Sequence, residues 1–302
     1  MPNPPRPPQH AQDHAAHRGR RTLAGAGLLL ALSAALLAGG AAQAAPAAAA
    51  TDSPSGQATT VTGAPAASPA PDKSRVTAAV LDLDGTGREP TVYGDDVTYD
   101  TASIIKVDIL ATLLLQAQDA GRPLTAQERA HAEPMIRHSD NAAANALWRE
   151  IGRAPGLEAA NKRLGLTETK GGSGTRWGLT RTTASDQIRL LRAVFGTGGK
   201  PDTGATGLDA DSRTYVRTLM AGVASEQAWG VSAASASGSA LKNGWLQRST
   251  SGLWDVNSVG RIVVDGHRYL VAVLSDGSIS MKDGVALVEK TARAALTSAS
   301  GH

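Results

Sequence analysis

Apolar and polar positions at the two ends of the region beyond residue 75 follow the pattern of β-strands. Near its start, short apolar runs bounded by turn residues predict strands at 76–83 and 91–93. In the C-terminal third, three similar runs predict strands at 238–245, 255–264 and 268–275. Both ends of this region are therefore expected to contribute to a sheet.

Between these strands the pattern becomes helical. The segment 103–116 is apolar on nearly every side, so its helix is expected to be buried in the centre of the domain. The other predicted helices lie at 125–137, 141–151, 155–164, 183–195 and 209–222, with an amphipathic one at 283–297. Strands at both ends with a block of helices between them predict an α+β domain.

Composition confines this domain to residues 75–298. All ten aromatic residues lie between Tyr93 and Tyr269, whereas ten of the fifteen prolines lie before residue 75. The segment 45–74 consists mostly of Ala, Pro, Ser, Thr and Gly, which bury too little apolar surface to offset the entropy lost on ordering. We therefore expect a flexible linker at 45–74 and one folded domain at 75–298.

Residues 1–44 have the features of a secretory signal peptide. Arginines precede an apolar Leu- and Ala-rich stretch, and the small residues of Ala42-Gln43-Ala44 follow it. This last motif favours cleavage after Ala44 over an uncleaved membrane anchor, although the apolar stretch almost reaches spanning length. Arg20-Arg21 is compatible with twin-arginine export, so the export route stays open. We expect a secreted protein, free or attached to the cell wall, without stable membrane insertion.

Charge and cysteine content exclude several functional classes. The net charge is +3, and residues 1–44 account for all of it, so the remainder is formally neutral. A neutral domain argues against nucleic acid as a partner. The absence of cysteine excludes disulfides, thiolate catalysis and Cys-ligated metals. No histidine spacing typical of metal sites occurs either, so no metal or cofactor is expected.

Three short motifs combine residue types that support nucleophilic catalysis. Ser103-Ile104-Ile105-Lys106 opens the buried helix, Ser139-Asp140-Asn141 precedes the helix at 141–151, and Lys242-Asn243-Gly244 lies on the first C-terminal strand. Each motif alone is weak, because Ser-x-x-Lys occurs about once in a chain of this length by composition. Lys106, however, lies in a helix with almost no other polar residue, where an unpaired ammonium would be costly.

The chemistry of these side chains points to an activated serine. Ser103 and Lys106 are three residues apart and share one helix face. A serine at a helix N-terminus faces free N–H groups, and a desolvated lysine can act as a base toward the neighbouring hydroxyl. Lys242 and Ser139 would add a positive charge and a hydroxyl for proton relay, and Asn141 would hold a substrate carbonyl or amide.

Two other titratable residues lie close to these motifs. His138 could assist Ser139, but a solvated or capping role is favoured because Lys106 already supplies a base. Asp108 is expected on the helix face opposite Ser103, paired with an arginine.

In their order and context, the motifs resemble the S-x-x-K, S-D-N and K-T-G signature of the class A β-lactamase and penicillin-binding superfamily of serine hydrolases. The flanking segments 135–145, 163–169 and 182–186 also resemble the corresponding segments of that family. The likeness covers the whole domain at 75–298. It implies a β-lactamase/transpeptidase-like fold, in which an antiparallel sheet from both chain ends is flanked by helices and a central subdomain is all-helical.

The resemblance also implies roles for individual residues. Ser103 would be the nucleophile and Lys106 its base, while Ser139 would relay a proton to the leaving nitrogen and Lys242 would attract a substrate carboxylate. The implied substrate-binding residues are Asn141, Asn243, Gly244 and Trp245. The oxyanion hole would be formed by the backbone N–H groups of Ser103 and Trp245. The expected partner is a small β-lactam or a peptidoglycan peptide, bound by a monomer.

Two departures from the family pattern bear on turnover. Residues 169–185 contain no Asp or Glu, whereas class A enzymes use an Ω-loop Glu to activate the deacylating water. Asn243 stands where the family usually has a hydroxyl residue that contacts the substrate carboxylate. We therefore expect an acyl-enzyme that is slow to deacylate. The alternative is a β-lactam- or cell-wall-binding module that is acylated very slowly or not at all.

Overall fold

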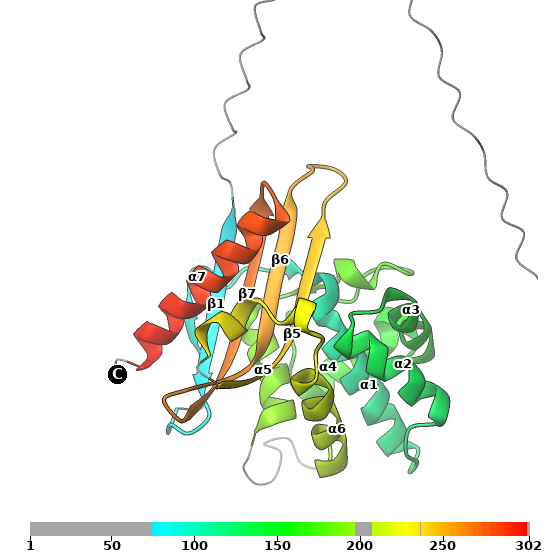
Figure 1. Cartoon of the computed structure of the whole chain (residues 1–302). Helices are drawn as coiled ribbons and strands as arrows, with labels where there is room; N and C mark the ends of the chain where they lie inside the picture. Colours follow the sequence, from blue (N-terminus) through cyan, green and yellow to red (C-terminus); the bar gives the residue numbers. More distant parts are fainter. Residues whose placement is uncertain (1–73, 88, 197–206, 236, 301–302) are drawn as a thin grey trace, which may run out of the picture. The chain divides into compact units, whose positions relative to one another are not determined.

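The computed structural model describes residues 74–87, 89–196, 207–235 and 237–300, all within the unit 64–302 (Figure 1). The predicted signal peptide at 1–44 and, apart from Ser74, the predicted linker at 45–74 lie outside the described residues. Their boundaries therefore stay predictions. Among the helices of the described ranges, none has the length and apolar character needed to cross a membrane.

The first and last strands of the described chain lie side by side in one sheet. The strands are β1 (Arg75–Asp82), β2 (Thr91–Tyr93), β5 (Ser237–Gln247), β6 (Trp254–Val264) and β7 (His267–Ser278). They form an antiparallel sheet in the order β2-β1-β7-β6-β5, in which β1 pairs with β7 along its whole length. A separate two-stranded sheet joins β3 (Tyr99–Asp100) to β4 (Arg181–Thr182). The predicted sheet from both chain ends is confirmed.

Helices cover both faces of this sheet (Figure 1). They are α1 (Ile105–Asp119), α2 (Ala126–Arg137), α3 (Asn141–Glu150), α4 (Arg153–Leu164), α5 (Ala184–Phe195), α6 (Ala210–Ala221) and α7 (Met281–Ser300). Short 3₁₀ turns are η1 (Ala102–Ile104), η2 (Trp177–Leu179), η3 (Ser225–Gln227) and η4 (Gly230–Ala234). An apolar cluster that includes Val271 and Val288 lies between the sheet and α7, and a larger one that includes Ile109 and Leu274 lies on the other face.

The helix α1 is buried on nearly all sides, as predicted from its apolar sequence. One polar residue within it differs from expectation. Asp108 is 1% exposed and lies near Gln187 and Asp186 of α5, and burial raises the pKa of its carboxyl to about 8. The prediction of an arginine partner is wrong for the described part of the chain, because the groups around this carboxyl are an amide and a second acid.

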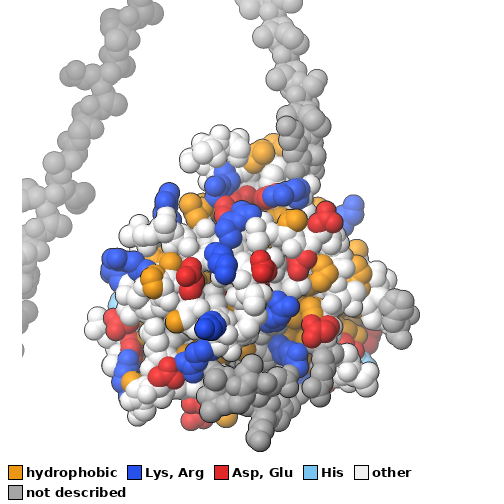
Figure 2. Space-filling model, turned by 180° about the vertical axis from the view of Figure 1, so that it is seen from behind, with side chains coloured by type: hydrophobic (Ala, Val, Ile, Leu, Met, Phe, Trp, Pro, Cys, Tyr) orange, Lys and Arg blue, Asp and Glu red, His pale blue; other side chains and the backbone are white. Residues whose placement is uncertain are grey.

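Charged side chains of both signs are interspersed on the face shown in Figure 2. A mixed surface of this kind produces no large field of a single sign. The expectation that nucleic acid is not a partner of the chain stays a prediction.

Candidate active site

Ser103 lies in the 3₁₀ turn η1, and the α-helical part of the segment begins two residues later, at Ile105. The preceding residue, Ala102, has a left-handed φ of 46°, a strained conformation for a residue with a side chain. The backbone on the N-terminal side of Ser103 is held from two directions. Thr101 N–H donates to Thr180 O at 2.8 Å, and Asn257 Nδ2 donates to Thr101 O at 3.1 Å. Ser103 is therefore fixed by both the loop and the sheet.

Lys106 lies at the centre of the site and contacts three other residues of the motifs. Its Nζ lies 3.0 Å from Ser103 Oγ, 3.0 Å from Ser139 Oγ, 2.6 Å from Ser139 O and 2.8 Å from Asn141 Oδ1. The carbonyl of Ser139 and the amide oxygen of Asn141 can only accept, so they take the two hydrogens of a neutral amine. The lone pair of that amine is then left for a hydroxyl. This geometry suits Lys106 as a base toward Ser103.

In the Ser139-Asp140-Asn141 motif, one residue caps a helix and the other two contact Lys106. Ser139 has a left-handed φ of 56°, directly before α3. Asp140 Oδ1 accepts a hydrogen bond of 2.6 Å from Ala143 N, which caps the N-terminus of α3. Asn141 is the first residue of the helix and directs its oxygen at Lys106. Asp140 thus builds the turn that brings its two neighbours to the lysine.

A second buried lysine reaches the same hydroxyl. Lys242 on β5 is 0% exposed, and its Nζ donates to Ser139 Oγ at 3.0 Å and to Asn243 O at 2.7 Å. Burial lowers the pKa of Lys106 to about 7, and burial together with the nearby Lys106 lowers the pKa of Lys242. Two ammonium groups on one hydroxyl would repel each other, which favours a neutral amine in this pair near neutral pH.

Gly244 allows β5 to pass directly over η1. A Cβ on this residue would lie 2.7 Å from Ser103 N and 2.8 Å from Ile104 N, closer than real Cβ atoms approach. Only glycine fits so near the start of the helix. The backbone that follows Gly244 therefore lies beside Ser103.

The side chains of Asn243 and Trp245 lie away from this contact, because alternate residues of a strand face opposite sides of the sheet. Asn243 Nδ2 donates to Gln227 O at 2.8 Å and to Trp229 O at 2.9 Å, which uses both amide hydrogens. The indole of Trp245 lies 5.8 Å from that of Trp229, in the cluster next to α7. The structure thus does not bring the side-chain amide of Asn243 to the site. Trp245 can contribute to the site through its backbone, because its side chain lies elsewhere.

Two neighbours of the site were not assigned from the sequence. The ring of Trp177 in η2 lies over Lys106, with 4.9 Å between the ring centroid and Nζ, and Trp177 Nε1 donates to Asn145 Oδ1 at 2.8 Å. Asn257 on β6 ties the segment before Ser103 to the sheet. No sequence signal identifies Asn257, because β6 also contains Asp255, Ser258 and Arg261, and no spacing relates residue 177 to Lys106.

His138 lies apart from the serine–lysine group. Its side chain is 63% exposed, and its Nδ1 lies 3.9 Å from Glu226 Oε1. The expectation of a solvated histidine is confirmed.

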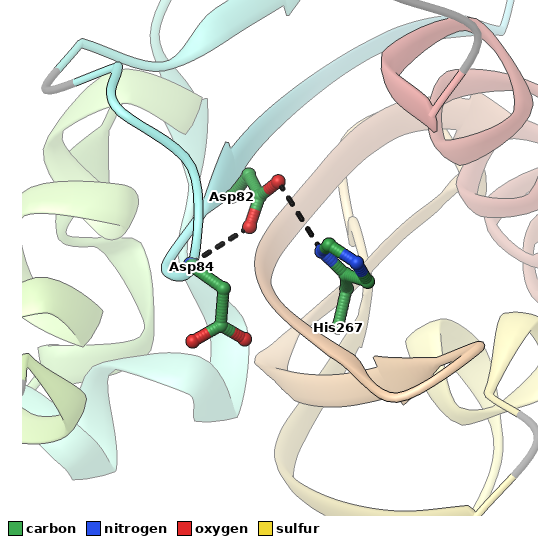
Figure 3. A group of neighbouring side chains, drawn as sticks. All are labelled: Asp82, Asp84 and His267. Carbon is green, nitrogen blue, oxygen red and sulfur yellow. Dashed lines mark hydrogen bonds and ion pairs between the residues drawn. The ribbon is translucent and has the colours of Figure 1, made fainter.

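A separate cluster of Asp82, Asp84 and His267 forms where β1 and β7 pair (Figure 3). His267 Nδ1 lies 3.9 Å from Asp82 Oδ2, and Asp84 N–H donates to Asp82 Oδ1 at 2.8 Å. The guanidinium of Arg268 contacts both carboxylate oxygens of Asp84 and lowers the pKa of that carboxyl to about 2. This ion pair joins the turn after β1 to the start of β7, so the cluster has a structural explanation.

The lysine-centred geometry agrees with what the sequence matches among known proteins. The sequence model of the "Beta-lactamase enzyme family" matches residues 124–299. The chain belongs to this family. It is also similar to the "Putative lipoprotein LppW" of Mycobacterium tuberculosis, with 30% identity over 226 residues that cover 74% of this chain and 68% of the relative.

Solved structures of a β-lactamase and of PBP-A share the fold. The TLA-1 extended-spectrum β-lactamase has a TM-score of 0.61 at 16% identity, over 75% of this chain and 94% of that chain. PBP-A has a TM-score of 0.62 at 20% identity, over 78% of this chain and 93% of that chain. At these identities the likeness shows the fold alone. The predicted β-lactamase/transpeptidase-like fold is therefore confirmed.

Proposed function

We propose that this protein is an exported serine hydrolase in which Ser103 is acylated by a β-lactam or a peptidoglycan-like amide and the acyl group is released slowly. The observation that carries the proposal is the 3.0 Å distance between Ser103 Oγ and the Nζ of a fully buried lysine whose pKa is lowered to about 7. Family membership supports a serine hydrolase of the β-lactamase and penicillin-binding type. The name of the mycobacterial relative, a lipoprotein, supports export.

Acylation uses groups that already lie together. Neutral Lys106 takes the proton of Ser103 while Oγ attacks the carbonyl carbon of the substrate. The developing oxyanion accepts hydrogen bonds from the backbone N–H groups of Ser103 and Trp245. As the carbon–nitrogen bond breaks, the Ser139 hydroxyl passes its proton to the leaving nitrogen and regains one from Lys106. Lys242, which donates to the same hydroxyl, stabilises the negative charge that Ser139 would develop.

Substrate binding is assigned to the polar groups that border the nucleophile. Ser103 and Ser139 are half-buried and Asn141 is exposed, so the site opens to solvent on their side. The amide of Asn141 would hold a substrate carbonyl or amide, and the charge of Lys242 would attract a carboxylate. A small β-lactam or a peptidoglycan peptide bound by a monomer would meet these groups.

Deacylation lacks the loop carboxylate that class A enzymes use to activate water. Residues 169–185 contain no Asp or Glu. Among the acids in the described ranges, Asp140 is the one whose charge acts on Lys106, and its Oδ1 is used to cap α3. General-base assistance is worth about 10²–10⁴-fold, so the release of the acyl group should lag behind its formation.

A chromogenic cephalosporin is expected to give a burst of about one equivalent of product, followed by slow turnover, because acylation precedes a slower release. Stopped-flow absorbance at several protein concentrations measures the amplitude of the burst. A linear trace at high rate from the first turnover would show that another group activates the water. The absence of both product and adduct would favour the binding module, an alternative supported by the buried amide of Asn243.

The rate of acylation is expected to rise with pH through about 7. Lys106 accepts a proton only when it is neutral, and with a pKa lowered to about 7 its neutral fraction grows as the pH increases through that value. Rates of labelling by a fluorescent penicillin across this range measure the profile. A rate that is constant or falls as the pH increases would contradict the assignment of Lys106 as the base.

Gly244→Ala is expected to lower the acylation rate by about tenfold to a hundredfold, because the new Cβ forces β5 away from Ser103 N and misplaces the oxyanion donors. Labelling rate and melting temperature should be measured together. Gly87→Ala is the matched control, since a Cβ at that position meets no atom within 4 Å. An unchanged rate in Gly244→Ala would show that this close approach does not shape the site.

A further inference from the structure

The ring of Trp177 covers Lys106, the proposed catalytic base. The Nζ of Lys106 is fully buried, although three of the side chains around it, Ser103, Ser139 and Asn141, reach the surface. The indole face of Trp177 lies 4.9 Å from this nitrogen. Lys106 thus has polar acceptors on one side and an aromatic ring on another.

The indole is held in place by α3. Trp177 Nε1 donates to Asn145 Oδ1 at 2.8 Å. Asn145 is one helical turn beyond Asn141, whose oxygen accepts from Lys106, so one face of α3 holds both the lysine and the ring above it. Gly178, which follows Trp177 in η2, lies against the residue before the nucleophile, because a Cβ at position 178 would be 3.8 Å from Ala102 Cα.

The loop that carries Trp177 is closed by contacts between its two ends. Lys170 and Arg181 exchange backbone hydrogen bonds of 2.8 and 2.9 Å, and Gly172 N–H donates to Thr180 Oγ1 at 3.0 Å. From α3, Trp148 Nε1 donates a hydrogen bond of 2.8 Å to Gly174 O in the loop. These contacts fix the position of η2, so the indole belongs to a defined loop and its cover over Lys106 is part of the fold.

We propose that Trp177 is a positioning residue that prolongs the acyl-enzyme by covering Lys106 and keeping water from that side of Ser103. The inference rests on the proposed function and deepens it. To release the acyl group, a water oxygen must bond to the ester carbon, the bond from that carbon to Ser103 Oγ must break, and a proton of the water must pass through a base to Oγ. The nearest base is Lys106. A ring face offers no lone pair to orient a water beside it, but it does attract a cation.

Three variants distinguish the effect of the aromatic ring from the effect of the hydrogen bond that anchors it. Trp177→Ala removes the cover, Trp177→Phe keeps an aromatic face without the indole N–H, and Asn145→Ala keeps the ring but removes its hydrogen bond. Each protein is acylated with a penicillin, freed from excess ligand and followed by intact mass.

Trp177→Ala is expected to release the acyl group about tenfold faster or more, a fraction of what a well-placed general base supplies, with a smaller change in acylation. Trp177→Phe and Asn145→Ala both keep an aromatic ring but lose the hydrogen bond that anchors it, so both should fall between the wild type and Trp177→Ala. A merely structural role would change acylation, release and melting temperature together. Equal release rates in wild type and Trp177→Ala would overturn the proposal.

A second measurement does not depend on acylation. Reductive methylation at neutral pH, mapped by peptide mass, reports the access of reagent to Lys106, with the equally buried Lys242 as internal reference. Trp177→Ala should increase the methylation of Lys106 relative to Lys242, and equal labelling in the two proteins would refute the cover. If no variant forms an adduct, the proposed function fails and the effect on release fails with it. The methylation result would then still decide whether Trp177 shields the lysine.

Discussion

Ser103→Ala is expected to abolish covalent labelling by a fluorescent penicillin and to leave the melting temperature nearly unchanged. The hydroxyl is the atom that would form the ester, and it belongs to a half-buried side chain at the mouth of the site, so its loss creates no large cavity. Gel fluorescence after a timed incubation measures labelling, and thermal unfolding measures stability.

The matched control is Ser251→Ala, which removes an exposed hydroxyl from the turn between β5 and β6. It should label as the wild type does. Labelling that persists in Ser103→Ala would contradict the assignment of the nucleophile. The next candidate would be Ser139, whose hydroxyl also lies 3.0 Å from Lys106 Nζ.

Lys106→Met is expected to lower the acylation rate by about a hundredfold or more, because methionine fills similar space but cannot take a proton. The rise of the rate with pH through about 7 should disappear as well, since it reflects the neutral fraction of this lysine. Stopped-flow or quenched labelling over a range of pH measures both effects. Lys106→Arg is a second test, because arginine keeps a donor for the Ser139 and Asn141 oxygens but stays protonated.

Lys170→Met is the control for these variants, since it removes an exposed lysine at the base of the loop. The melting temperature must be recorded for Lys106→Met, because the oxygens of Ser139 and Asn141 lose their donor. A folded Lys106→Met protein that acylates at the wild-type rate would exclude Lys106 as the base. Lys242 would then be the alternative, acting through Ser139.

The larger elements could be predicted because their sequence patterns are local. The apolar run of α1 and the shorter apolar runs of β5 to β7 extend over many consecutive residues, and the observed ends of these elements differ from the predicted ones by only a few residues. The pair β3 and β4 could not be found in this way. Each strand has two residues, and their pairing joins segments far apart in the chain, so only the folded structure brings them together.

The proposed catalytic pair was more accessible to prediction than its surroundings. Ser103 and Lys106 are three residues apart, and their contact follows from helical spacing. The convergence of Lys106 and Lys242 on Ser139 was expected from the resemblance to a family, since no local rule relates residues so distant in sequence. The contact of Trp177 with Lys106 could not be predicted for the same reason, because it depends on the path of the loop.

Asp108 shows a further limit of local reasoning. A charged residue on a helix is normally placed on a solvated face or beside an opposite charge. In α1 every face is buried, and the carboxyl of Asp108 is desolvated beside Gln187 and Asp186. The surroundings of such a helix come from segments that its own periodicity does not describe.

Intact-mass measurement over time with a penicillin tests the proposed acyl-enzyme most directly. The wild type should gain the mass of one intact penicillin molecule quickly and lose it slowly after the free drug is removed, while Ser103→Ala should gain none. Peptide mapping should locate the added mass on the segment that contains Ser103. A wild-type protein that never gains this mass, or an adduct that also forms on Ser103→Ala, would contradict the proposal.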